Sequence, residues 1–87
     1  MYIVILKPRA EKQLSKLREK DRTRIKSAID QLWENPYFGK KMDGSLAGCY
    51  SIRVWPWRII YVIQKDIVTV TVVAIGDRKD IYKKLRG

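Results

Sequence analysis

Arg53 and Arg58 are the two residues of this 87-residue sequence whose type and spacing best suit chemistry on an anion. They lie in two strand-like runs, 49–54 and 57–64, which only two residues separate. If these runs pair as an antiparallel hairpin, the two arginines stand directly opposite each other and point to the same face. Like charges in this arrangement destabilise a sheet by about 0.2–1 kcal/mol, and no acidic residue in these strands is available to relieve them. Two converging guanidinium groups match the oxygen atoms of a phosphate, so the pair predicts an anion site.

The charge balance points to the same kind of ligand. The chain has 19 Lys and Arg residues against 9 Asp and Glu residues, a formal net charge of +10 and a pI near 10.0. A fold of this size cannot spread such an excess thinly, so its surface potential attracts polyanions such as RNA. The alternative is that the charge only keeps the protein soluble, but a much smaller charge is enough for that.

The composition also excludes several classes of protein. With no histidine and the single cysteine Cys49, a conventional zinc or transition-metal site is excluded, and we expect no cofactor. Cys49 cannot form an intramolecular disulfide, which suits a reducing cytoplasm. It also has no histidine to activate it as a nucleophile. No apolar run is long enough to cross a bilayer, and residues 2–6 are too short for the core of a signal peptide. We therefore expect a cytoplasmic protein.

The periodicity of apolar residues predicts the elements that hold the arginines. A strand over 2–6 is followed by two helices, one that begins at Pro8 and one capped by Asp21. A loop over 35–48, three strands over 49–54, 57–64 and 67–75, and a terminal helix over 78–86 complete the order β-α-α-β-β-β-α. We expect a single α+β domain over residues 1–87, with a helical hairpin packed on a mainly antiparallel four-stranded sheet.

The expected register sorts the strand residues into two faces. A second two-residue turn sets Ile63 opposite Val68, Tyr61 opposite Val70 and Ile59 opposite Val72, which makes one face apolar. The core is expected to include this face, Trp57 and the stripe of the second helix, which ends in Trp33. The other face carries the arginines, together with Ser51, Thr69, Thr71, Ile60, Val62 and Val73. Trp55 is expected to share that face, where its ring could stack on a base.

Three segments in the second half of the chain resemble the RelE/ParE superfamily of prokaryotic toxins. They are YSIRV (50–54), WRIIYVI (57–63) and AIGDRKDIY (74–82), in this order and at this spacing. The resemblance runs over essentially the whole chain and implies a microbial-RNase-like fold of RelE type. It also implies a type II toxin–antitoxin system, with cleavage of mRNA in the ribosomal A site and so inhibition of translation.

The resemblance assigns roles to individual residues. Arg53 matches the second of two basic residues on the family's second strand, Arg58 the arginine that begins the third strand, and Arg78 the arginine after the fourth. Tyr82 matches an aromatic residue near the C-terminus. Ser51 departs from the pattern, because several active members have a lysine there. Lysines that could replace it are Lys40, Lys41, Lys79 and Lys83, which we expect to contact RNA together with Trp55.

The chemistry required of these residues is cleavage of RNA without a metal. The substrate's own 2′-OH attacks the adjacent phosphorus, and the three arginines stabilise the added negative charge. Arginine does not give up its proton, so proton transfer falls to Tyr82 or a lysine, whose pKa a cationic pocket lowers. The alternative for Tyr82 is a role in stacking or packing only.

Because Ser51 stands where several active members have a lysine, two other functions remain open. One is a ParE-like inhibitor of DNA gyrase, which shares this fold but acts on a protein. The other is a basic RNA-binding domain without enzymatic activity. For the toxin, the expected partners are the ribosome, mRNA and an acidic RelB-like antitoxin. A partly disordered segment of that antitoxin is expected to fold around the basic toxin in a heteromeric complex.

Overall fold

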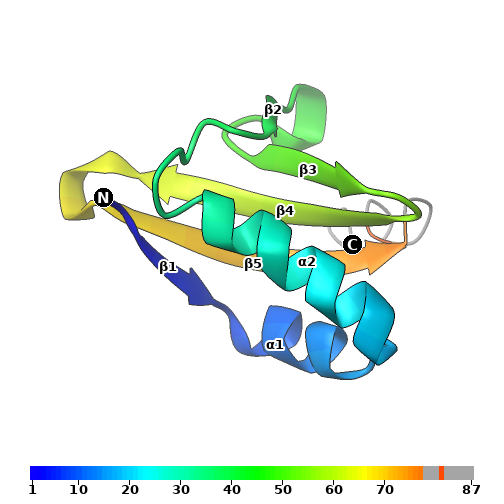
Figure 1. Cartoon of the computed structure of the whole chain (residues 1–87). Helices are drawn as coiled ribbons and strands as arrows, with labels where there is room; N and C mark the ends of the chain where they lie inside the picture. Colours follow the sequence, from blue (N-terminus) through cyan, green and yellow to red (C-terminus); the bar gives the residue numbers. More distant parts are fainter. Residues whose placement is uncertain (78–80, 82–87) are drawn as a thin grey trace.

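The computed structural model describes residues 1–77 and residue 81, and it has the α+β architecture expected from the sequence. The helices are α1 (Pro8–Ser15) and α2 (Glu19–Gln31), and the strands are β1 (Ile3–Leu6), β2 (Lys40–Lys41), β3 (Tyr50–Val54), β4 (Trp57–Gln64) and β5 (Thr69–Asp77). Short 3₁₀ turns, η1 (Gly44–Leu46) and η2 (Lys65–Ile67), lie between strands. The sheet order is β1-β5-β4-β3-β2, with β1 parallel to β5 and the other neighbours antiparallel. Both helices pack on one face of this sheet (Figure 1).

The sheet has five strands, so the expectation of four was wrong. The additional strand, β2, lies inside the segment 35–48 that was expected to be a loop. It forms because Lys40 pairs with Ser51 and Lys41 pairs with Tyr50 at the edge of β3. The terminal helix expected over 78–86 lies, apart from residue 81, outside the described residues.

The helices bury the expected stripes, with one exception. Pro8 opens α1, where its missing N–H is no loss. The stripe of α2 packs into the core through Ile25, Ala28 and Ile29. Trp33 was expected in the core, but it is 46% exposed because α2 ends at Gln31 and the chain turns away from the stripe. Within residues 1–77 and 81, no helix is long and apolar enough to cross a membrane.

The register of the first hairpin is as expected, and that of the second is not. Tyr50 pairs with Tyr61 and Arg53 with Arg58 across the two-residue turn. In the second hairpin Tyr61 pairs with Val72 instead of Val70, a shift of two residues. The shift arises because η2 lengthens the turn and Val68 adopts a left-handed conformation with φ 50°. From Thr69 to Val72, a shift of two keeps each side chain on its expected face, but Val68 leaves the core and is 44% exposed.

A β-bulge divides the long pairing of β4 with β5. Ile60 pairs with Ala74 and Tyr61 pairs with Val72, so Val73 is an extra residue in β5. Beyond the bulge Ile59 pairs with Ile75, and not with Val72 as expected.

The sheet carries an apolar cluster on each face. The main core lies under the helices and includes Ile25, Leu32, Ile59 and Tyr61, with the half-buried Trp57 packed against it. A small second cluster of Ile60, Ala74 and Ile81, with Met42 and Cys49 against it, covers part of the other face. The face that carries the arginines is therefore open only in part.

The buried hydroxyl of Tyr61 fixes the chain that leads into β2. It donates a hydrogen bond to the Pro36 carbonyl at 2.8 Å and accepts one from the Gly39 N–H at 2.9 Å. Gly39 has no room for a side chain, because a Cβ there would lie 2.6 Å from the Tyr61 hydroxyl oxygen and 2.9 Å from the Ser51 carbonyl oxygen. Desolvation by burial raises the pKa of Tyr61, which keeps the donated proton in place. The ring of Tyr50 stacks on Tyr61 with centroids 5.5 Å apart.

Removal of this hydroxyl tests its role. We expect Tyr61→Phe to lower the free energy of unfolding by about 1–3 kcal/mol, because the Gly39 N–H and the Pro36 carbonyl both lose their partner. The measurement is urea denaturation. Tyr50→Phe is the control, since it keeps the stacked ring and removes the neighbouring hydroxyl. Equal losses in both variants would contradict a special role for the Tyr61 hydroxyl.

Candidate functional site

Arg53 and Arg58 lie opposite each other on the sheet face away from the helices. A hollow of about 270 Å³ next to them is lined by Phe38, Gly39, Lys40, Ser51, Ile52, Arg53 and Arg58. A second hollow of about 240 Å³ is lined by Lys40, Lys41, Met42, Asp43, Ser51 and Arg58. Because Lys40, Ser51 and Arg58 line both, the hollows are adjacent. We call the two together the cationic groove.

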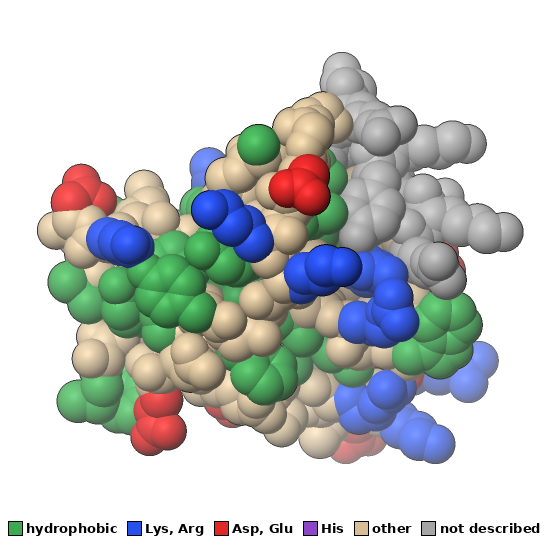
Figure 2. Space-filling view, turned by 90° about the horizontal axis from the view of Figure 1, so that it is seen from above, with side chains coloured by type: hydrophobic (Ala, Val, Ile, Leu, Met, Phe, Trp, Pro, Cys, Tyr) green, Lys and Arg blue, Asp and Glu red, His purple; other side chains and the backbone are tan. Residues whose placement is uncertain are grey.

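The groove crosses β2, β3 and β4, and strand register explains which side chains reach it. Lys40 stands opposite Ser51, and Arg53 stands opposite Arg58, which pairs in turn with Gly76. Phe38 precedes β2 by two residues and lines the same hollow as Arg53 and Arg58. Side chains two residues apart on a strand share a face, so these rows face the same side. Figure 2 shows Lys and Arg side chains gathered toward the end of the molecule that carries the β3–β4 turn.

Positive charge dominates the groove. Among the described residues that line it, the cations are Lys40, Lys41, Arg53 and Arg58, and the one carboxylate is Asp43. A hollow lined by charges of one sign focuses the field and concentrates anions inside it. The guanidinium pair adds directed donors that match phosphate oxygens. The arrangement therefore suits a phosphate group and the stabilisation of negative charge that develops on it.

The structure brings together four of the residues that were expected to act on RNA: Arg53, Arg58, Lys40 and Lys41. The expected contact of Trp55 with RNA stays a prediction. Trp55 is 58% exposed in the turn between β3 and β4 and lines neither hollow. The remaining expected site residues, Arg78, Lys79, Tyr82 and Lys83, lie outside the described residues.

Two features of the groove were not expected from the sequence. Phe38 lines the groove, although it lies in the predicted loop 35–48, where the apolar residues show no periodicity. Only its spacing of two residues from Lys40 could have indicated this position. Ser51 lies between the two hollows and is 6% exposed. Its hydroxyl has no hydrogen-bond partner among the described residues. A small side chain here leaves open the space between Lys40 and Arg58.

Cys49 has no place in the chemistry of the groove. It packs against the second apolar cluster and lines neither hollow. Burial raises the pKa of its thiol, which disfavours the reactive thiolate. This agrees with the expectation that Cys49 is not a nucleophile.

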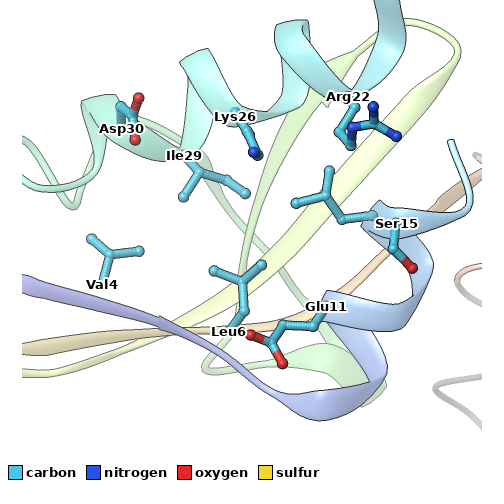
Figure 3. Close-up of a pocket in the computed structure, with 9 residues that line it drawn as sticks. Val4, Leu6, Glu11, Ser15, Arg22, Lys26, Ile29 and Asp30 are labelled. Atoms are coloured by element: carbon cyan, nitrogen blue, oxygen red, sulfur yellow. The ribbon is translucent and has the colours of Figure 1, made fainter. Parts of the chain in front are cut away.

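A cavity of about 600 Å³ lies on the helix side of the sheet, between β1 and the two helices (Figure 3). Its apolar lining comes from β1, α1 and α2, and charged side chains border it. The apolar residues are Val4, Leu6, Leu14 and Ile29, and the polar ones are Glu11, Ser15, Arg22, Lys26 and Asp30. We call this cavity the helix-side groove. An open apolar floor with a charged border suits a protein segment better than a small substrate.

Comparison with known proteins places the chain among toxins. The sequence profile of the family described as ParE toxin of type II toxin–antitoxin system, parDE, matches residues 4–82. Curated protein sequences give no significant match. Solved structures of toxin–antitoxin complexes do match. The RelBE2 complex from Mycobacterium tuberculosis has 26% identity and a TM-score of 0.81, over 88% of this chain and 98% of that one. The intact RelBE complex of E. coli has 25% identity and a TM-score of 0.78, over 91% and 99%. The RelB–RelE complex of Methanococcus jannaschii has 26% identity and a TM-score of 0.72, over 92% and 96%.

Anion binding by the arginine pair can be measured directly. We expect inorganic phosphate to raise the melting temperature of the wild-type protein, and Arg53→Gln to lose most of that increase. Arg9→Gln is the matched control, because it removes the same charge from an exposed position on α1. Without phosphate and at low salt, Arg53→Gln should be more stable than the wild type by about 0.2–1 kcal/mol, since the repulsion from Arg58 is gone. An equal response of both variants to phosphate would contradict the site.

Proposed function

We propose that the chain, which belongs to the ParE toxin family of type II toxin–antitoxin systems within the RelE/ParE superfamily, is a ribosome-dependent endoribonuclease that cleaves mRNA in the A site. The observation that supports a nuclease is the cationic groove, in which Arg53 and Arg58 meet over the open part of the sheet. The proposed place of action is the cytoplasm, where the ribosomes are.

In the proposed reaction the RNA's own 2′-OH attacks the adjacent phosphorus and the 5′-oxygen leaves. Arg53 and Arg58 hold the phosphate and stabilise the negative charge that builds on its oxygens. Arg78 is proposed to join them, and Tyr82 to transfer a proton, both by resemblance to the superfamily. A tyrosine or lysine close to several cations has a lowered pKa, which moves it toward the range useful for proton transfer. The ribosome supplies the geometry of the substrate.

Lys40 is the lysine best placed to compensate for Ser51. The two residues are paired across β2 and β3, and both line the two hollows. A long side chain on the edge strand can thus bring its ammonium group over the small buried serine. We propose that Lys40 supplies the cation that other members carry at the position of Ser51.

The second candidate function is inhibition of DNA gyrase. It is favoured by the family match, whose description names ParE toxins. A third candidate is binding of RNA without cleavage. Inhibition of gyrase does not require two opposed arginines inside a groove, and for this reason we prefer the nuclease to it. Binding of RNA without cleavage would use the same groove, and mapping of mRNA 5′ ends separates it from the nuclease.

Expression in bacteria distinguishes these functions. We expect induction of the wild-type protein to arrest growth and to create new mRNA 5′ ends inside codons. Arg53→Ala and Arg58→Ala should each reduce this cleavage by about a hundredfold or more, as loss of one charge-stabilising donor does in other enzymes. Arg9→Ala should remain fully toxic. Intact mRNA together with gyrase-linked DNA damage would instead support the second candidate, and intact mRNA and DNA the third.

We also propose that an acidic antitoxin neutralises this toxin. The matched structures from M. tuberculosis, E. coli and M. jannaschii are complexes of a toxin with its antitoxin. The helix-side groove is the proposed docking surface. Its floor of Val4, Leu6 and Ile29 fits the apolar face of an amphipathic segment, and Arg22 and Lys26 on its border fit acidic side chains.

A charge reversal on the border tests this docking surface. We expect Lys26→Glu to slow association with the cognate antitoxin and to weaken the dependence of that rate on salt. The variant should arrest growth as before but should no longer be fully rescued by the antitoxin. Lys12→Glu, which makes the same change at an exposed position of α1 outside the groove lining, is the control. Equal antitoxin affinities for both variants would place the docking surface elsewhere.

A further inference from the structure

Phe38 is a large aromatic side chain that the fold leaves exposed inside a charged groove. It is 49% exposed and lines the hollow that also contains Arg53 and Arg58. Other exposed aromatic rings in the described part of the chain, Trp33, Tyr37 and Trp55, line neither hollow of the cationic groove. Single exposed apolar residues need no explanation in general, but this ring lies beside a phosphate-binding pair.

Phe38 and the arginine pair are close enough for a single nucleotide to contact both. Phe38 lines the same hollow of about 270 Å³ as Arg53 and Arg58, which stand opposite each other on β3 and β4. The ring and the two guanidinium groups therefore border one small space. In a nucleotide, a single ribose separates the base from the phosphate. A base against Phe38 thus leaves its phosphate close to the guanidinium pair.

The backbone around Phe38 is held before any ligand binds. On one side the Pro36 carbonyl accepts from the Tyr61 hydroxyl, and on the other the Gly39 N–H donates to it. The Phe38 N–H itself donates to the Asn35 carbonyl at 3.1 Å. A ring on a fixed backbone loses little conformational entropy when a ligand stacks on it.

From these observations we infer that Phe38 is a base-stacking residue, and that the cationic groove takes single-stranded RNA with a nucleobase against this ring and the adjoining phosphate between Arg53 and Arg58. The inference deepens the proposed function and rests on it for the choice of RNA as ligand. Stacking accepts any base, because every base has a π face. Phe38 therefore positions the strand and does not select a sequence.

Binding of two matched ligands tests the inference. The ligands are a short 2′-O-methyl oligouridylate, which cannot be cleaved, and an abasic oligomer of equal length that keeps the phosphates. We expect Phe38→Ala to weaken binding of the oligouridylate by about 5- to 100-fold, the range of one lost stacking contact, and to leave abasic binding unchanged. Phe38→Trp should bind the oligouridylate as tightly as the wild type or more tightly.

Trp33→Ala is the matched control, because Trp33 is an aromatic residue of similar exposure outside the cationic groove. It should leave the affinity for both ligands unchanged. A photoreactive 5-iodouridine in the oligomer should crosslink to Phe38 in the wild type and to the substituted residue in Phe38→Trp. Thermal unfolding of each variant checks that the fold is intact.

Two results would overturn the stacking role. One is an oligouridylate affinity that does not change in Phe38→Ala, and the other is an equal loss for both ligands, which would indicate a structural effect. The outcome is separable from that of the proposed function. If mRNA stays intact in cells while Phe38→Ala still loses affinity for the oligouridylate alone, the nuclease proposal fails and the stacking inference stands.

Discussion

The hydrogen-bonded hydroxyl of Tyr61 is the constraint on which the site depends. It lies in the main core, yet it holds both ends of the segment that carries Phe38. That segment leads directly into β2, so the same bridge sets the register that brings Lys40 opposite Ser51. A strand of two residues has little stability of its own. The buried tyrosine thus connects the packing under the helices to the geometry of the opposite face.

The two faces of the sheet serve different purposes. The helix side carries the main core, and its buried apolar residues supply the stability of a small domain. The other face carries Arg53 opposite Arg58, an arrangement that opposes folding. A fold tolerates such a local conflict where function requires it. The second cluster of Ile60, Ala74 and Ile81 offsets part of this cost by covering the rest of that face.

The structure could be predicted from the sequence where local rules determine it. It could not be predicted where an unusual backbone conformation or contacts distant in the sequence determine it. The arginine pairing could be predicted because a two-residue turn leaves one register. The second hairpin could not, because the left-handed conformation of Val68 is unusual for a β-branched residue and lengthens the turn. Similarly, β2 and the position of Phe38 depend on the contact of Tyr61 with residues more than twenty positions away. Trp33 was misplaced because the helical stripe was continued past the end of α2.

Because of the β-bulge at Val73, the number of residues in β5 determines which of its side chains face the site. The extra residue reverses the alternation of side chains in β5, so that Ala74 and Gly76 face the arginine side. Loss of one residue at this point would turn the end of β5 over. Ile81 would then lose its anchor against Gly76 and the second cluster. An insertion or deletion at this place therefore changes which face of the sheet each side chain at the end of β5 points to, whereas a substitution there does not.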